Sequence, residues 1–111
     1  MDLSITSEAQ ESAHVVQIGG DLDVYTAPQL KDALDRLGLA GKTVVLDLTG
    51  VHFIYSTALG VLVAAFQQSR AADGELSLVM EDPYLLKIFR ITGFDTLFSI
   101  FPGIAEALGQ G

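Results

Sequence analysis

Ser56 is the residue whose type and position could support catalysis, because it stands between an apolar, strand-like segment and a segment with helical periodicity. A serine exposed at such a turn can act as a nucleophile when it lies in a Gly-x-Ser-x-Gly elbow with a general base nearby. Here Ile54 and Ala58 occupy the two glycine positions. The histidines are His14 and His52, and one histidine near one serine does not make a triad. We interpret His52 as a surface or hydrogen-bonded residue at a strand end, and we predict that the protein is not an enzyme.

The other polar segments offer little for metal or nucleotide chemistry. Asp21 and Asp23 place two carboxylates on a loop, which is too few ligands for a calcium site. The pair at 19–20 is Gly-Gly, but it lacks the later glycines and the Lys-Ser/Thr of nucleotide-binding loops, so we interpret it as the turn that ends a strand. The chain contains no cysteine, which removes disulfides and thiolate ligands. We therefore expect no metal site and no cofactor.

Two roles fit a serine at the start of a helix. Ser56 could cap the helix, because a serine oxygen accepts a hydrogen bond from a backbone N–H that has no partner in the first turn. The same position suits a phosphate, because free N–H groups and the positive end of the helix dipole favour an anion. A phosphoryl group on Ser56 would add about two negative charges and three acceptor oxygens. It would alter any surface that docks there without unfolding the helix.

Composition limits the class of partner. The chain has 111 residues, which fits one domain spanning 1–111, and half of them are hydrophobic. Six basic and fourteen acidic residues give a net charge of −8, which argues against nucleic acids and anionic membranes. The charge serves solubility or forms an acidic face for a basic partner. The longest apolar run, 58–66, is too short to cross a bilayer, and no signal peptide is evident, so we expect a cytoplasmic protein without membrane insertion.

Alternating strand and helix signals predict the elements that hold Ser56. Apolar and β-branched segments predict strands at 3–6, 15–18, 43–48, 76–80 and 98–101. The run 43–48 is apolar up to Asp47, which is typical of a strand buried on both faces. The order ββαβαβαβα predicts an α/β fold, a mixed sheet of four to five strands with parallel pairs and about four covering helices.

Four helices follow from capping and periodicity. Thr26, with Pro28 and Gln29 behind it, predicts a capping box at the first helix. The second helix, 58–70, is apolar nearly all round, so we expect it to be largely buried. Asp82-Pro83 begins the third helix and Gly93 ends it. Its buried side is predicted to comprise Leu85, Leu86, Ile88, Phe89 and Ile91. Pro102 opens a last helix that runs through Leu108.

Taken in order, four segments resemble a known family, the bacterial anti-sigma factor antagonists, which are single STAS domains. The segments are Gly20-Asp21-Leu22-Asp23, Ala27-Pro28-Gln29-Leu30, Val44-Val45-Leu46-Asp47-Leu48, and Val51-His52-Phe53-Ile54-Tyr55-Ser56-Thr57-Ala58-Leu59-Gly60-Val61-Leu62. The resemblance extends over nearly the whole chain, as far as Gly93 and the closing strand and helix. It implies the STAS-like α/β fold that the strand and helix pattern also predicts.

The resemblance implies a partner switch. In the family, the unphosphorylated antagonist binds an anti-sigma factor and a sigma factor is released for transcription. The anti-sigma factor is also a serine kinase that uses ATP, and it phosphorylates the serine that opens the helix, which corresponds to Ser56. The phosphorylated form no longer binds until a phosphatase restores it. The implied partner-binding residues here are Asp23, Tyr55, Ser56 and Thr57.

Two positions depart from the family pattern. Tyr55 stands where the family usually has Asp, and Ala58 stands where it often has Gly. Tyr55 fits a tolerated aromatic residue, a changed partner, a serine that is not phosphorylated or an engineered substitution. The alternative function that Tyr55 favours is a STAS regulatory or structural subunit of another complex, such as a membrane transporter.

Overall fold

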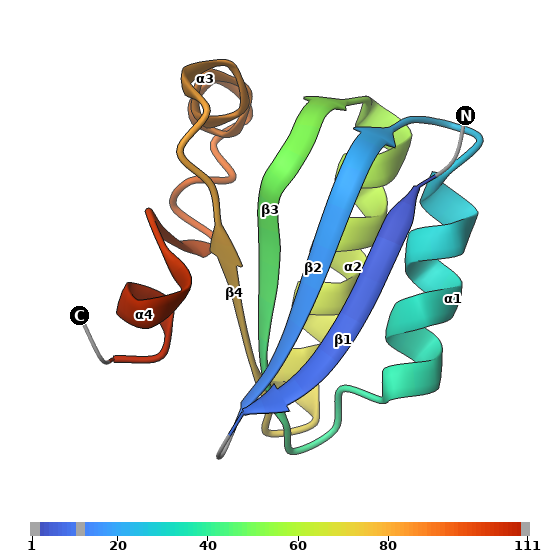
Figure 1. Cartoon of the computed structure of the whole chain (residues 1–111), viewed down its shortest axis with the longest axis vertical. Coiled ribbons are helices and arrows are strands. Elements are labelled where there is room, and N and C mark those ends of the chain that lie inside the picture. The colour runs from blue at the N-terminus through green and yellow to red at the C-terminus, as the bar shows by residue number, and fades with distance from the viewer. Residues whose placement is uncertain (1–2, 11–12, 110–111) are drawn as a thin grey trace.

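Five strands form one mixed sheet in the order β1-β2-β3-β4-β5 (Figure 1). The structure is a computed structural model that describes residues 3–10 and 13–109. β1 pairs antiparallel with β2, and every later pair is parallel. The strands are β1 (Ser4–Gln10), β2 (Ala13–Leu22), β3 (Thr43–Ile54), β4 (Glu75–Val79) and β5 (Ser99–Phe101). The predicted α/β class, its element order and its mixed sheet are confirmed.

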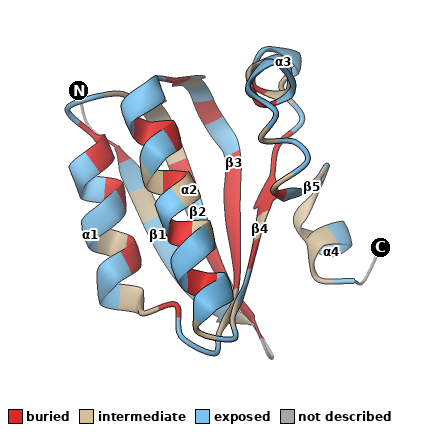
Figure 2. Ribbon diagram, turned by 180° about the vertical axis from the view of Figure 1, so that it is seen from behind, coloured by how far each residue is buried: buried red, intermediate tan, exposed pale blue. Residues whose placement is uncertain are grey.

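The helices cover the two faces of the sheet unequally. The helices are α1 (Ala27–Leu37), α2 (Ser56–Ala71), α3 (Pro83–Thr92) and α4 (Ile104–Ala107). α1 and α2 lie side by side on one face, where their buried residues join the main core (Figure 2). α4 packs on the other face against a small cluster of Val15, Val45 and Val79. No helix within 3–10 and 13–109 has both the length and the apolar character that a bilayer span requires.

β3 is the centre of the fold and is buried on both faces, as predicted. Val44, Leu46 and Leu48 point into the main core, while Val45 belongs to the cluster under α4. All four side chains are 0% exposed. Burying a Val or Leu side chain contributes about 1.5–3 kcal/mol, so β3 anchors the sheet from which the later loops extend.

The predicted end of the second strand at Gly19-Gly20 is wrong, because β2 continues to Leu22. The pairing of β2 with β3 shifts register on either side of these glycines. At Gly50 of β3, an added Cβ would lie 3.2 Å from both the Gly19 Cα and the Ile18 carbonyl oxygen. Glycine at position 50 therefore permits a close approach of two strands, and Gly20 takes a left-handed φ of 109° within β2 rather than ending it. As a result both strands reach the same end of the molecule without a break.

Two burial predictions also fail. α2 is not buried all round: Ala58, Leu62 and Ala65 face the core, whereas Gly60 and Ala64 are exposed. The helix covers only one face of the sheet beside α1, and small residues on its outer side make it look uniformly apolar. In α3 the buried side is carried by Leu85 and Phe89, and Ile91 is 72% exposed. The predicted stop at Gly93 is confirmed by its left-handed φ of 80°.

Candidate functional site

The start of α2 meets the turn after β2 at the carboxyl end of the parallel strands. The Tyr55 N–H donates to the Leu22 carbonyl at 2.8 Å, which ties the end of β3 to the end of β2. Crevices at the carboxyl ends of parallel strands are common binding positions in α/β folds. Here a hollow of about 300 Å³ is lined by Asp23, Val24, Tyr25, Tyr55, Ser56 and Thr57. All four predicted site residues therefore lie around one hollow.

Ser56 does not cap its helix, so of the two roles that fit its position the capping role is wrong. The N-cap is Tyr55, with extended backbone angles of −91° and 162°, and its side chain makes no capping hydrogen bond. Ser56 is the first helical residue and is exposed. The Ala58 and Leu59 N–H groups already bond to the Tyr55 carbonyl. The N–H groups of the first turn before them have no helical partner, so the start of α2 keeps donors that an anion can use.

Asp23 organises the turn on the other side of the hollow. Its Oδ1 accepts hydrogen bonds from the N–H groups of Tyr25 and Thr26, both at 2.9 Å. The bond from the Thr26 N–H is the main reason that the pKa of Asp23 lies below its ordinary value of 3.8. The side chain is therefore a carboxylate at neutral pH. It places a fixed negative charge beside Ser56.

The predicted capping box at α1 is wrong for a related reason. Thr26 is buried, and its hydroxyl donates to the Asp21 carbonyl at 2.7 Å and accepts from the Asp23 N–H at 2.9 Å. The hydroxyl is used inside the turn, so it makes no capping bond to the helix. Thr26 thus fixes the Asp23 turn rather than the start of α1.

Aromatic side chains surround this end of the sheet, and the sequence analysis did not anticipate most of them. Tyr25 is 81% exposed and Tyr55 is 52% exposed. The Phe53 ring lies 4.5 Å from the Tyr55 ring and 5.6 Å from that of Tyr84 on α3, measured between centroids. All three tyrosines of the chain therefore gather here. The available signal was that each tyrosine lies within three residues of a strand end or a helix cap, and that Val24, beside Tyr25, is also exposed.

In the described part of the chain, neither a histidine nor a cluster of metal-ligating side chains lines this hollow. His52 is exposed on β3, in agreement with its interpretation as a surface residue. Among the residues that the structure describes, no group of three or more His, Asp or Glu side chains could hold a metal ion. The arrangement offers an accessible hydroxyl, unpaired N–H donors, a carboxylate and aromatic rings. These are groups for docking a protein surface and for accepting a phosphate.

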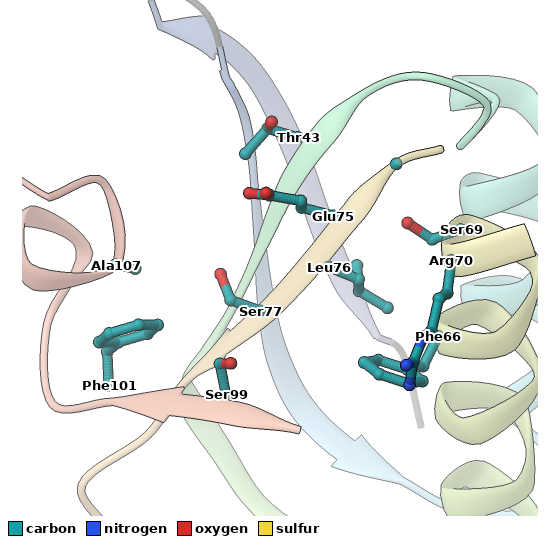
Figure 3. Close-up of a pocket in the computed structure, with 11 residues that line it drawn as sticks. Thr43, Phe66, Ser69, Arg70, Glu75, Leu76, Ser77, Ser99, Phe101 and Ala107 are labelled. Atoms are coloured by element: carbon teal, nitrogen blue, oxygen red, sulfur yellow. The ribbon is translucent and has the colours of Figure 1, made fainter. Parts of the chain in front are cut away.

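A second hollow, of about 380 Å³, lies at the opposite end of the parallel strands (Figure 3). Its lining includes Thr43, Glu75, Arg70 and Ser69. The Ser69 hydroxyl is buried and has no hydrogen-bond partner among the described residues. Along α2, about 15–21 Å separates the helix residues that line this hollow from Ser56, so the two do not form one site.

Comparisons with known proteins agree on one family. The model of the STAS domain family matches residues 4–107. The anti-sigma-B factor antagonist of Listeria monocytogenes is 35% identical over 102 residues, covering 90% of this chain and 90% of that protein. The anti-sigma-B factor antagonist of Staphylococcus aureus is 31% identical over 104 residues, covering 93% of this chain and 96% of that protein.

A solved structure of an anti-sigma factor antagonist has a similar fold. The crystal structure of an anti-sigma factor antagonist from Mycobacterium paratuberculosis superposes with a TM-score of 0.88 and 27% identity. The match covers 97% of this chain and 92% of that one. The family model, the relatives and the solved structure all point to one conclusion. The chain belongs to the STAS domain family, in the group that contains the anti-sigma factor antagonists.

Proposed function

We propose that this protein is an anti-sigma factor antagonist that binds an anti-sigma factor with serine kinase activity, and that phosphorylation of Ser56 ends this binding. Relatives with the name of anti-sigma-B factor antagonist support the first part. The observation that carries the second part is the accessible Ser56 hydroxyl at an uncapped helix start. A phosphatase would reset the switch. The 111 residues would act as one non-catalytic regulatory domain in the cytoplasm.

Phosphate chemistry fits the start of α2. The N–H groups of the first turn and the positive helix end would stabilise a phosphate on Ser56 without moving the backbone. The phosphate would bring about two negative charges next to the Asp23 carboxylate, which lines the same hollow. A partner that covers the hollow would have to remove water from both groups. Because about 1.4 kcal/mol changes affinity tenfold, a modest penalty is enough to release the partner.

Tyr55 is compatible with this proposal. Its ring lies against Phe53 and its side chain makes no bond at the helix start. The ring therefore leaves the Ser56 hydroxyl accessible and adds aromatic surface at the edge of the hollow. Exposed tyrosines are frequent anchors of protein interfaces. We propose that Tyr55 contributes to partner choice in place of the family's Asp.

The test is phosphorylation and binding with the purified cognate anti-sigma factor kinase. With ATP, mass spectrometry should find one phosphate on wild-type protein, located at Ser56, and none on Ser56→Ala. Calorimetry should show that Ser56→Ala keeps its affinity while Ser56→Asp loses about 100-fold, or ~2.7 kcal/mol. Gln67→Glu is the matched control, because it adds a negative charge on the same helix about three turns away.

The proposal fails in two distinguishable ways. If an active kinase binds the protein but leaves Ser56 unmodified, the docking part stands and the switch does not exist. If the kinase does not bind and a transporter component is captured instead, the protein is a STAS subunit of another complex. Equal affinities for Ser56→Ala and Ser56→Asp would also remove the switch.

A further inference from the structure

The two edges of the sheet differ in how they are protected. β5 forms one edge with only three residues, and α4 follows it closely in the chain. β1 forms the other edge (Figure 1) with seven residues, Ser4–Gln10, and its pairing with β2 has no register shift. Its one charged side chain is Glu8, and it contains no proline. Natural edges of this length are normally blocked by charges, prolines or bulges, so β1 presents an open row of backbone donors and acceptors.

A hollow of about 560 Å³ runs beside this edge, between β1 and α1. Its apolar lining comprises Leu3, Ile5, Ala33 and Leu37, and its polar lining comprises Ser7, Gln29, Asp32 and Arg36. Figure 2 shows α1 lying along the β1 side of the molecule with its outer surface exposed. The open strand edge and the helix therefore form one continuous flank.

The charged side chains of α1 could pair with those of a second copy of the same flank. Asp32 and Arg36 are four residues apart, so they share one side of the helix, and both are exposed. The ion pair that α1 does form joins Lys31 to Asp35 at 2.7 Å. Within 3–10 and 13–109, neither Asp32 nor Arg36 takes part in a salt bridge. A two-fold axis reverses the direction of the helix, so an axis that passes midway between these residues would place Asp32 of each copy opposite Arg36 of the other.

We propose that this flank is a homodimer interface, in which β1 of a second copy pairs antiparallel with β1 about a two-fold axis at Ser7. In that register Ile5 lies opposite Ala9 of the other copy, on the side of the helices. Glu8 lies opposite Thr6, so the two like charges do not face each other. The ten strands of the two copies form one continuous sheet.

The size of the flank indicates how tightly the two copies should bind. A strand of seven residues is about 24 Å long, and with one helix from each copy it gives an interface near the lower limit of ~1,200 Å² for stable pairs. We expect a Kd in the micromolar range. The proposal does not depend on the proposed function, because no residue that lines the Ser56 hollow lines the β1–α1 hollow.

The first test is sedimentation equilibrium of the full chain from about 1 to about 500 µM, at ~0.15 M salt to screen the net charge of −8. The average mass should rise from that of one chain toward that of two. Ser7→Lys places like charges on the two-fold axis and should keep the chain monomeric throughout. Gln67→Lys, which makes the same charge change on the exposed side of α2, should dimerise like the wild type.

The second test swaps charges and uses only exposed residues of α1. Asp32→Arg and Arg36→Asp should each weaken dimerisation about 10-fold, because each breaks both symmetric pairs and adds like-charge contacts. The double variant Asp32→Arg/Arg36→Asp should recover to within about 3-fold of the wild type, since it restores the pairs in reverse. A wild-type chain that stays monomeric overturns the proposal. So does a dimer that neither Ser7→Lys nor the single charge changes weaken.

Discussion

The starts of α2 and α3 occupy similar places in the fold, but their N-termini are capped differently. Each helix follows a parallel strand, β3 or β4, at the same end of the sheet. At α3 the Asp82 carboxylate accepts a hydrogen bond from the Tyr84 N–H at 2.8 Å, and Pro83 removes another donor. At α2 the cap position holds Tyr55, whose side chain makes no capping hydrogen bond, and Ser56 is exposed. The first turn of α3 has a side-chain cap, whereas the first turn of α2 keeps N–H donors without a helical partner.

α2 can be stable without a side-chain cap because tertiary packing holds it in place. Its buried face includes Ala58 and Leu62, both 0% exposed, and the Tyr55 N–H is bonded to the Leu22 carbonyl. A missing cap costs about 1 kcal/mol, which two or three buried aliphatic side chains easily exceed. A helix held from its side can leave its end open for function.

The largest expected effect that tests this comparison is removal of the α3 cap. Asp82→Ala should lower the free energy of unfolding by about 1 kcal/mol, because the Tyr84 N–H loses its acceptor. Ser56→Ala, the matched change at α2, should stay within about 0.5 kcal/mol of the wild type. Urea denaturation followed by circular dichroism measures both. A larger loss for Ser56→Ala would mean that α2 relies on a side-chain cap after all.

A smaller effect should come from giving α2 the cap it lacks. Tyr55→Asp places a carboxylate at the N-cap and should raise the free energy of unfolding by about 0.5 kcal/mol, after the loss of the ring contact with Phe53. Tyr55→Leu is the control, because it removes the ring without supplying an acceptor. The same denaturation experiment applies, and a destabilised Tyr55→Asp would show that the ring outweighs the cap.

The smallest expected effect concerns pH and the Asp23 turn. Hydrogen bonds from the turn hold the pKa of Asp23 below 3.8 in the folded protein. Its carboxylate therefore adds stability above about pH 4, and this stability is lost as the pH falls through the folded pKa. The stability difference between wild type and Asp23→Asn should shrink between pH 6 and pH 2.5. A difference that stays constant over this range would contradict the assignment.

Short sequence motifs correctly predicted those elements whose boundaries depend on only a few neighbouring residues. Asp82-Pro83 and Gly93 bounded α3 correctly, since a cap, a fixed proline φ and a left-handed glycine act within a few residues. The apolar run of β3 was also sufficient, because a strand buried on both faces has few alternatives. Gly19-Gly20 was misinterpreted because the strand continues through it: Gly20 takes a left-handed φ of 109° inside β2, and Gly50 of the neighbouring strand lies close to Gly19. That contact joins segments about thirty residues apart and leaves no trace in either segment alone.

The candidate site was also predicted only in part from the sequence. Family resemblance supplied Asp23, Tyr55, Ser56 and Thr57, and the structure places all four around one hollow. Periodicity could not reveal that Phe53 and Tyr84 meet, because their contact depends on where β3 and β4 end. Thr26 was assigned to the wrong role because the Asp23 turn and the helix cap compete for the same hydroxyl. Such competition is settled only by the arrangement of the whole loop.

The gathering of the exposed tyrosines outside the core has a consequence for evolution. Tyr25, Tyr55 and Tyr84 are each at least 45% exposed, so their replacement disturbs the packed interior little. Duplicated copies of such a protein can exchange these side chains and diverge in the partner they recognise while the scaffold stays unchanged. Parallel signalling pathways in one cell can in this way become insulated from one another. Tyr55, where the family resemblance leads us to expect Asp, is the kind of substitution from which that insulation would begin.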